Sequence, residues 1–253
     1  MATNLFDLRD RVALVTGGNG GIGLGMARGL AEAGARVAIA GRDAAKAEEA
    51  LAVLGPEAAF IAVDIADQAS CRAMVEEATR RFGRLDILVN NAGINIRKQP
   101  QDFTAEEWHQ VLDTNLSGSF FAAQAVYPAM KEAGGGKIIN IGSMMSIFGA
   151  SFTTAYAASK GAVVQMTKAL ATAWAIDNIQ VNAVLPGWID TDLTRGARQQ
   201  VEGLHDRVLA RTPAGRWGAP QDLAGIAVFL GGPGSDFVTG TAIPVDGGYS
   251  SQG

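Results

Sequence analysis

The chain has 253 residues, of which 48% are hydrophobic and 18% are charged, and its formal net charge at pH 7 is −4. This composition is typical of a globular protein that buries a core, and it excludes a disordered chain. The slightly acidic balance, without a lysine or arginine cluster, argues against nucleic acid or a membrane surface as a partner.

Cysteine content and apolar segments limit the protein further. Cys71 is the single cysteine, so an intrachain disulfide and a cysteine-based zinc site are excluded, and we expect no bound metal. The first residues lack the basic and then apolar pattern of a secretory signal. No apolar segment reaches the ~18 residues that a membrane span needs. We therefore expect a soluble, cytoplasmic protein.

Short apolar runs rich in β-branched residues alternate along the chain with longer, alanine-rich segments of helical period. The predicted strands are 12–15, 36–40, 59–63, 85–90, 137–141, 180–185 and 242–245. The predicted helices are 22–33, 44–54, 70–82, 103–131 (as one helix or two), 154–174 and 221–230. Strands that are almost continuously apolar indicate a parallel sheet covered on both faces. We predict a single α/β domain over residues 1–253, of the Rossmann type: a doubly wound, seven-stranded parallel sheet with helices on both faces.

A glycine-rich turn follows the first predicted strand. It has the spacing Gly-x-x-x-Gly-x-Gly at Gly17, Gly21 and Gly23, and a helix begins at once. Glycines let the backbone turn tightly and approach a pyrophosphate, while the helix N-terminus offers free N–H groups. Such a turn can also be a plain strand-to-helix connection, but its place after the first strand of an α/β chain favours a dinucleotide site.

Tyr156 and Lys160 lie four residues apart in a predicted helix, downstream of Ser143 at the end of a predicted strand. Positions i and i+4 share a helix face, so the phenol and the ammonium can point into one cavity. A nearby cation favours phenolate and lowers the pKa of the phenol from about 10. Such a tyrosine can donate a proton to a carbonyl oxygen or accept one from an alcohol. The same spacing also occurs as a surface pair, so it needs support from other motifs.

Five motifs together resemble the short-chain dehydrogenase/reductase family, and they occur in that family's order over nearly the whole chain. They are Thr16-Gly17-x-x-x-Gly21-Ile22-Gly23, Asn90-Asn91-Ala92-Gly93, Asn115, Ser143 with Tyr156-x-x-x-Lys160, and Pro186-Gly187, and the match continues to Val245-Asp246-Gly247-Gly248. The resemblance implies an NAD(P)-dependent oxidoreductase that transfers a hydride between a nicotinamide cofactor and a secondary alcohol or ketone. A dinucleotide-binding protein without catalytic activity is the non-enzyme alternative.

The resemblance also implies roles for individual residues. Tyr156 would exchange the proton, Lys160 would lower its pKa and bind the nicotinamide ribose, and Ser143 would hold the substrate oxygen. Asn115 would position a water that leads protons from Lys160 to solvent. The alternative for Asn115 is a helix-interior asparagine bonded to its own backbone. Ser146 competes with Ser143, but we interpret it as part of a loop over the substrate.

The cofactor would contact segments that match the family's dinucleotide site. The predicted contacts are Gly17, Asn19, Gly20, Gly21, Ile22, Gly23, Arg42, Asp64, Ile65, Asn91, Ala92, Gly93, Tyr156, Lys160, Pro186, Gly187, Ile189 and Thr191. Asp64 would bind the adenine amino group, or alternatively cap the following turn. Asn91 would mainly tie the fourth strand to its neighbours.

The end of the second strand bears on the choice of cofactor. Gly41 stands where an NAD-preferring relative usually carries an acid, so a 2′-phosphate has room and Arg42 can pair with it. Asp43 is interpreted as the N-cap of the next helix. Gly20 stands where many NADP-using relatives carry a basic residue, which weakens this preference. We predict NADP in preference to NAD.

The substrate is the least determined feature. A segment at 188–211 would fold over it, with Ser143, Arg97 and Trp188 as candidate contacts. Three stretches, 91–98, 139–146 and 212–218, resemble the branch that contains gluconate 5-dehydrogenases and deoxygluconate dehydrogenases. This implies a sugar acid or polyol, with Arg97 as a cation for a carboxylate or as a plain surface arginine. A 3-oxoacyl-[acyl-carrier-protein] reductase or another ketone reductase is the alternative. Family resemblance and the apolar residues on 154–174 imply a homotetramer.

Overall fold

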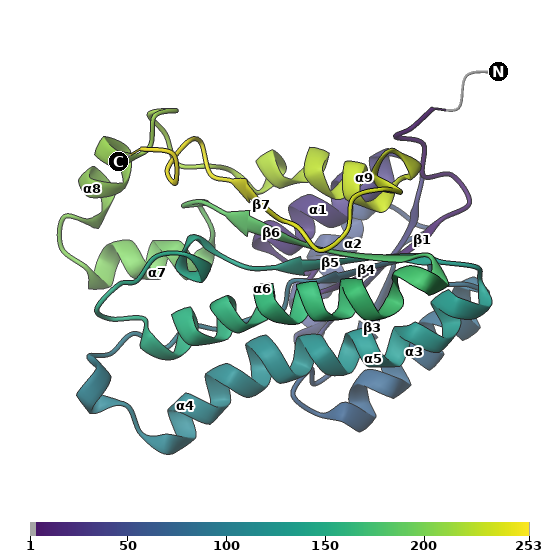
Figure 1. Ribbon diagram of the computed structural model, residues 1–253, viewed down its shortest axis with the longest axis horizontal. Helices are drawn as coiled ribbons and strands as arrows, with labels where there is room; N and C mark the ends of the chain where they lie inside the picture. Colours follow the sequence, from purple (N-terminus) through teal and green to yellow (C-terminus); the bar gives the residue numbers. More distant parts are fainter. Residues whose placement is uncertain (1–3, 253) are drawn as a thin grey trace.

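A seven-stranded parallel sheet forms the centre of the computed structural model, which describes residues 4–252 (Figure 1). Its strands are β1 (Val12–Thr16), β2 (Arg36–Gly41), β3 (Ala59–Ala62), β4 (Ile87–Asn90), β5 (Gly136–Ile141), β6 (Ile179–Pro186) and β7 (Ala242–Val245). All seven predicted strands are confirmed, with ends that differ by at most two residues. β1, β4 and β6 are buried along their whole length because helices cover both faces of the sheet.

The strand order is β3-β2-β1-β4-β5-β6-β7. The first three strands are added toward one edge of the sheet and β4 to β7 toward the other, so the strand order reverses between the neighbours β1 and β4. The two strands are paired in register, with Thr16 opposite Asn90 at their carboxyl ends. In doubly wound sheets, the crevice outside the carboxyl ends at such a reversal is where ligands bind. The predicted doubly wound fold is therefore confirmed.

Helices cover the two faces of the sheet as separate layers. One face carries α1 (Gly21–Glu32), α2 (Ala44–Leu54) and α9 (Ala224–Gly231), and the other carries α3 (Gln68–Phe82), α5 (Gly118–Glu132) and α6 (Thr154–Trp174). Alternate side chains of β1 enter opposite layers: Leu14 belongs to the α3–α5–α6 cluster and Val15 to the α1–α2–α9 cluster. The sheet thus separates two apolar cores.

The region predicted as a helix at 103–131 is broken. Thr104 begins α4 (Ala105–Leu112) with a capping box that includes Glu107, and a π-helical turn at Asp113–Ser117 then separates α4 from α5. A π-turn is uncommon and is often found at functional sites. It places Asn115 inside the protein, fully buried.

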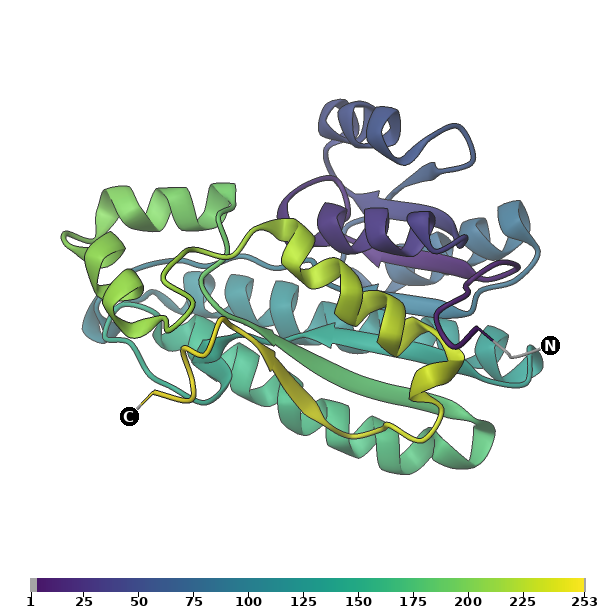
Figure 2. The ribbon, with the colours of Figure 1, turned by 90° about the horizontal axis from the view of Figure 1, so that it is seen from above.

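Two further helices, α7 (Asp192–Gln200) and α8 (Leu204–Arg211), form a unit beyond the carboxyl ends of the strands (Figure 2, green). They share a small apolar cluster of Ala197, Leu204 and Val208, packed against Trp188 and Trp217. The sequence predicted only a segment over the substrate here, without its helices. Among residues 4–252, no helix is both long and apolar enough to cross a bilayer.

Candidate active site

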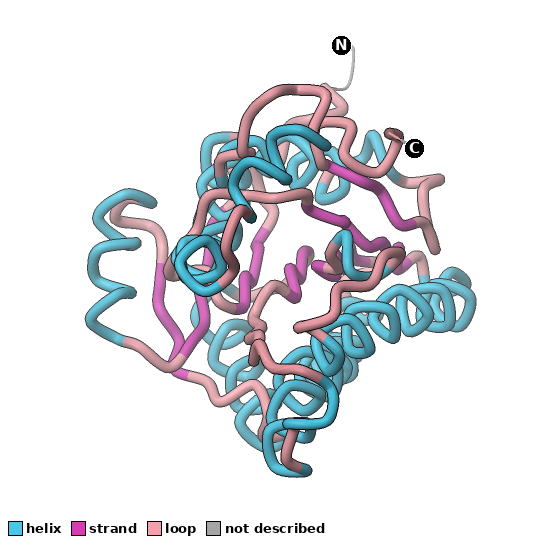
Figure 3. Tube along the Cα trace, turned by 90° about the vertical axis from the view of Figure 1, so that its left-hand side faces the viewer, coloured by secondary structure: helices cyan, strands magenta, loops and turns pink. Residues whose placement is uncertain are grey.

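A cavity of about 380 Å³ opens at the carboxyl ends of the strands. Figure 3 shows this end of the molecule, where loops gather between the helices. Most of the predicted site residues line it: Gly17, Asn19, Gly20, Gly21, Ile22, Asn91, Ala92, Gly93, Arg97, Ser143, Tyr156, Lys160, Pro186, Gly187, Trp188, Ile189 and Thr191. Five predicted residues do not line the cavity: Gly23, Arg42, Asp64, Ile65 and Asn115. One cavity therefore unites motifs that are spread over 175 residues of sequence, from Gly17 to Thr191.

The glycine-rich turn between β1 and α1 fits a dinucleotide. Gly17 and Gly21 have positive φ angles of 62° and 51°, which favour glycine. A Cβ on Gly23 would lie 2.3 Å from the carbonyl oxygen of Gly17, so this position packs the turn against the helix. Among the residues that the structure describes, none lies within 4 Å of a Cβ built on Gly20, and no side chain caps the start of α1. The free N–H groups of this helix end are therefore open to a phosphate.

Asn91 braces this turn, as its sequence position predicted. Its Nδ2 donates to the carbonyl oxygens of Thr16 and Gly17, both at 3.1 Å. The backbone N–H groups of Asn91 and Ala92 donate in turn to Thr16 Oγ1. These bonds hold the ends of β1 and β4 together, and thereby fix the floor of the cavity.

The ends of β2 and β3 frame the side of the turn away from Ser143. Asp43 Oδ1 accepts from the backbone N–H of Lys46 at 3.0 Å, so the predicted N-cap of α2 is confirmed. The side-chain amide of Asn19 lies 3.6 Å from a Cβ built on Gly41, and Arg42 is exposed beside it. Asp64 Oδ1 accepts from Ala66 N at 3.1 Å, so in this structure its carboxylate caps the turn, the alternative interpretation of this residue.

Ser143 follows β5 and lines the cavity. Its Oγ accepts from the backbone N–H of Met145 at 3.1 Å, which fixes the hydroxyl group at the start of the next turn. Ser146, interpreted from the sequence as part of a loop over the substrate, lies on the β5–α6 connection beside Met144 and Met145, which line the cavity. Its Oγ donates to the carbonyl oxygen of Lys160 at 2.8 Å, so Ser146 ties the β5–α6 connection to α6.

Tyr156 and Lys160 share the face of α6 that lines the cavity, as their spacing predicted. The Lys160 Nζ lies 5.7 Å from the centre of the Tyr156 ring and donates to the carbonyl oxygen of Ile141 at 2.7 Å. The ammonium is thus held between the phenol ring and the end of β5. Loss of hydration lowers the pKa of Lys160 to about 8, because burial disfavours its charged form.

The predicted lowering of the Tyr156 pKa is not found in this structure. Loss of hydration raises the pKa of the phenol, because the charged phenolate is the form that burial disfavours. The Ser143 hydroxyl and the positive charge of Arg97 act in the opposite direction but are outweighed. The sequence could not show that Lys160 would face the ring and bind a backbone carbonyl.

We expect the Tyr156 phenol of the cofactor-free protein to stay neutral up to its ordinary pKa of 10.0. Because the shift is upward, tyrosinate from this residue should form only above that pH. The measurement is the ultraviolet absorbance of tyrosinate in a pH titration of wild type minus Tyr156→Phe, in which Tyr127 and Tyr249 cancel. An ionisation step near neutral pH in this difference would mean that the neighbouring cations outweigh burial.

Asn115 lies beneath the cavity and connects three segments. Its Oδ1 accepts from Ile94 N at 2.8 Å, and its Nδ2 donates to Ile94 O and Ser159 Oγ, both at 3.0 Å. A Cβ on Gly93 would lie 3.1 Å from Asn115 Oδ1 and 3.5 Å from Lys160 Nζ. The amide oxygen and the ammonium therefore face one position. The alternative of an asparagine bonded to its own helix is excluded for this side chain.

Arg97 and Trp188 border the cavity at the α7 end. Arg97 donates from Nη2 to the Leu193 carbonyl at 2.9 Å and from Nη1 to Gln200 Oε1 at 3.2 Å. Both partners are neutral. Within residues 4–252, two buried polar atoms that border this cavity have no hydrogen-bond partner: Asn95 Oδ1 and Trp188 Nε1.

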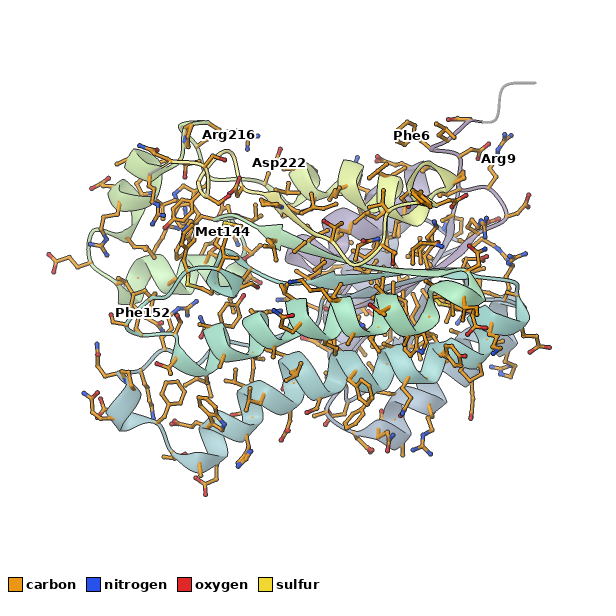
Figure 4. The ribbon with its side chains drawn as sticks, in the orientation of Figure 1. Phe6, Arg9, Met144, Phe152, Arg216 and Asp222 are labelled. Atoms are coloured by element: carbon orange, nitrogen blue, oxygen red, sulfur yellow. The ribbon has the colours of Figure 1, made fainter. Side chains whose placement is uncertain are left out.

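Several lining residues were not predicted from the sequence. They are Lys46, Asn95, Ile141, Gly142, Met144, Met145, Ala150, Phe152, Thr153, Asp192, Leu193 and Thr194. Met144 and Phe152 lie at the α7–α8 end of the molecule, opposite Phe6 and Arg9 (Figure 4). Lys46 carried a usable signal, since it is a cation one turn into the helix after Arg42. The apolar residues carried none, because nothing distinguishes them from core positions.

Known proteins resemble this chain over its whole length. A family model described as enoyl-(acyl carrier protein) reductase matches residues 17–250. The 2-dehydro-3-deoxy-D-gluconate 5-dehydrogenase of Dickeya dadantii is 44% identical, with 100% of each chain covered. The gluconate 5-dehydrogenase of Gluconobacter oxydans is 40% identical over 98% of this chain and 97% of its own. The crystal structure of a gluconate 5-dehydrogenase from Burkholderia cenocepacia, in complex with NADP and tartrate, is 42% identical with a TM-score of 0.94, and 100% of each chain is covered.

A glycine-rich turn shaped for a dinucleotide and a tyrosine–lysine pair that line one cavity suit the chemistry of a nicotinamide-dependent oxidoreductase. With relatives this similar from end to end, the chain belongs to the short-chain dehydrogenase/reductase family. It is an NAD(P)-dependent enzyme that acts on CH–OH groups of a small-molecule substrate and on the corresponding carbonyl compounds.

Proposed function

We propose that the enzyme interconverts the secondary alcohol and the ketone of a sugar acid of the gluconate type, with NADP(H) as the preferred cofactor. The observation that carries this proposal is Arg97. Its guanidinium group borders the cavity of Tyr156, and its partners are a carbonyl oxygen and an amide oxygen. A guanidinium group pairs with a carboxylate through two parallel hydrogen bonds, which a sugar acid offers and a neutral polyol does not.

The charge of the cavity supports an anionic substrate. Three cations line it (Lys46, Arg97 and Lys160), against a single described carboxylate, that of Asp192, which is already paired with Lys46. Burial lowers the pKa of Arg97, and the guanidinium group nevertheless stays charged because arginine starts so high. Tartrate in the Burkholderia cenocepacia relative is also a hydroxy carboxylate.

Tyr156 is the proton carrier in this proposal. Its phenol donates a proton to the substrate oxygen in reduction and accepts one in oxidation. The raised pKa keeps the phenol protonated in the cofactor-free protein, which suits the role of acid. Ser143 donates to the same substrate oxygen and stabilises the charge that develops there. Asn115 and Lys160 converge above Gly93, where a water would connect the ammonium to solvent.

A nicotinamide dinucleotide supplies or accepts the hydride when it is bound. The turn at 17–23 would hold its pyrophosphate, residues 91–93 its adenosine ribose, and Lys160 its nicotinamide ribose. Pro186, Gly187, Ile189 and Thr191 would border the nicotinamide. Asp64 and Ile65 would reach the adenine from outside the cavity. Gly41 leaves the ribose 2′ position free of a carboxylate, and Arg42 offers a cation there.

We also propose that residues 188–211 fold over the substrate, with Trp188 at its edge, and that the chain assembles as a homotetramer. Phe120 on α5 is 38% exposed, and Ala169 and Ala173 on α6 are exposed as well. Apolar groups on the outer face of two neighbouring helices suit helix-to-helix contact between subunits. The sedimentation coefficient of the purified protein tests this assembly.

The test of the proposed reaction is a substrate panel assayed with NADP(H) and NAD(H). We expect the highest kcat/KM for a keto-gluconate or gluconate with NADP(H), and lower values for a neutral polyol of the same length. A charge-assisted hydrogen bond of roughly 1.5–3 kcal/mol corresponds to a preference of about one to two orders of magnitude. A 3-oxoacyl thioester as the best substrate, or NAD(H) as the better cofactor, would refute the respective half of the proposal.

A further inference from the structure

An ion pair crosses the mouth of the cavity and joins two parts of the chain that are far apart in sequence. The Lys46 Nζ lies 2.8 Å from Asp192 Oδ2 and donates a hydrogen bond to it. Lys46 belongs to the first turn of α2, and Asp192 is the first residue of α7. Both residues line the same cavity as the glycine-rich turn. The pair therefore lies where a bound dinucleotide would pass from its adenosine half to its nicotinamide half.

The surroundings of Lys46 are those of the adenosine ribose subsite. Its backbone N–H is capped by Asp43, two residues after Gly41, and Asn19 Nδ2 donates to the carbonyl oxygen of Asp43 at 3.3 Å. Arg42, the cation proposed for the 2′-phosphate, is on the same connection. The Lys46 side chain starts in the first turn of α2, just after this connection, and its Nζ contacts the first residue of α7. A lysine stem is flexible enough to turn between two anions.

Asp192 does not depend on Lys46 alone. Its other carboxylate oxygen, Oδ1, accepts from Arg195 Nη1 at 2.8 Å. The side chains of Lys46 and Asp192 are 51% and 71% exposed, so both ions stay well hydrated in the pair. Exposed ion pairs of this kind contribute little to stability. Breaking the ion pair between Lys46 and Asp192 therefore costs little free energy. Asp192 would still be paired with Arg195 once Lys46 has left.

We propose that Lys46 is the second cation for the 2′-phosphate of NADP(H), and that Asp192 competes with the phosphate for it. In the cofactor-free protein Lys46 is paired with Asp192, and with NADP(H) it turns to the phosphate group. This inference rests on the proposed preference for NADP(H), because it adds a residue to that subsite. Gly20 supplies no basic residue to the phosphate, and Lys46 would take that place, so the phosphate would be held from two sides.

Competition for one cation gives the two partners opposite effects. Lys46→Gln removes a phosphate ligand, so the Kd of NADPH should rise roughly 3- to 10-fold while that of NADH changes little. Asp192→Asn releases Lys46 from its competitor, so the Kd of NADPH should fall, by about 2- to 5-fold. A plain clasp between α2 and α7 would behave differently, because loss of either partner would then weaken both cofactors alike.

The experiment measures Kd values by nucleotide fluorescence for NADPH and NADH, and by calorimetry for 2′,5′-ADP and ADP, without substrate. Lys131→Gln and Asp177→Asn are the matched controls, because they break an ion pair of 3.0 Å outside the cavity. Opposite shifts for Lys46→Gln and Asp192→Asn, confined to the ligands with a 2′-phosphate, support the proposal. Shifts in the same direction, equal effects on NADPH and NADH, or no change beyond the controls overturn it.

Arg42→Ala separates this inference from the proposed cofactor preference. If wild type binds NADH more tightly than NADPH and Arg42→Ala changes neither, the preference fails. The opposite shifts at Lys46 and Asp192 are read on the NADPH affinity alone, so they remain a separate result. If instead Arg42→Ala weakens NADPH and the Lys46 variant does not, the preference stands and the second cation is refuted.

Discussion

Tyr156→Phe is expected to lower kcat for ketone reduction by ~10²–10⁴-fold, the usual contribution of general acid–base catalysis. The variant loses only the hydroxyl group, and its ring can still lie beside the Lys160 ammonium, which is 5.7 Å from the ring centre in the wild type. Cofactor binding should therefore be largely retained. Steady-state turnover and nucleotide fluorescence measure the two quantities separately. A residual rate above about a tenth of wild type would remove Tyr156 from the role of proton carrier.

Tyr127→Phe is the matched control for this substitution. The Tyr127 hydroxyl donates to Asp177 Oδ2 at 2.7 Å on the outer helix layer. Tyr127→Phe therefore removes a phenol hydroxyl, as Tyr156→Phe does, but at a position outside the cavity. Turnover close to wild type is expected for this variant. Lys160→Ala should differ from both, because Lys160 would serve the proton path and the nicotinamide ribose. It is expected to lower the rate and the cofactor affinity together.

Arg97→Gln is expected to raise KM for a sugar acid by about 10- to 100-fold, with a smaller effect on kcat. Charge-assisted hydrogen bonds contribute roughly 1.5–3 kcal/mol, and each 1.4 kcal/mol is a factor of ten in affinity. A neutral polyol has no carboxylate to lose, so its kinetic constants should hardly change. The informative quantity is therefore the ratio of kcat/KM between the acid and the polyol, measured for wild type and variant.

Two further variants show whether a loss of activity in Arg97→Gln comes from the missing charge at this position. Arg28→Gln removes an exposed arginine from an i,i+4 pair with Glu32 on α1, and it should leave the ratio unchanged. Arg97→Lys keeps the charge but loses the planar fork, so we expect partial recovery. If Arg97→Gln impairs the acid and the polyol equally, Arg97 acts by supporting α7 through its bond to the Leu193 carbonyl and does not bind a carboxylate.

The fold could be predicted from the sequence wherever burial alone dictates residue type. Strands covered on both faces must be apolar throughout, and for this reason β1, β4 and β6 match their predicted ranges to within two residues. The helices α2 and α6 match their predicted ranges end to end. The motifs of the site could be predicted for a related reason. A glycine with positive φ, or a polar side chain between apolar neighbours, leaves a visible mark in the sequence, as Gly17 and Ser143 do.

The features that the sequence did not predict depend on tertiary contacts. The π-turn at Asp113–Ser117 has no local signal, because its register follows from Asn115 bonding Ile94 and Ser159. The helix α7 is polar over most of its length and buries only Ala197, so it offers few apolar residues from which a core-facing helix could be predicted. The direction of the Tyr156 pKa shift follows from loss of hydration at the phenol, which outweighs Ser143 and Arg97, and spacing alone does not specify how far the phenol is desolvated.

The α7–α8 unit has an apolar cluster of its own, separate from the clusters on the two faces of the sheet. A change of sequence between Leu193 and Arg211 therefore repacks the buried side chains of Ala197, Leu204 and Val208 against the two indole rings, whereas Ile189, before this segment, belongs to the cluster on the α1–α2–α9 face. The sequence of this segment can therefore vary while the glycine-rich turn and the helix α6, which carries Tyr156, are retained. The same separation makes 193–211 the natural segment to transplant between relatives when a new substrate is sought.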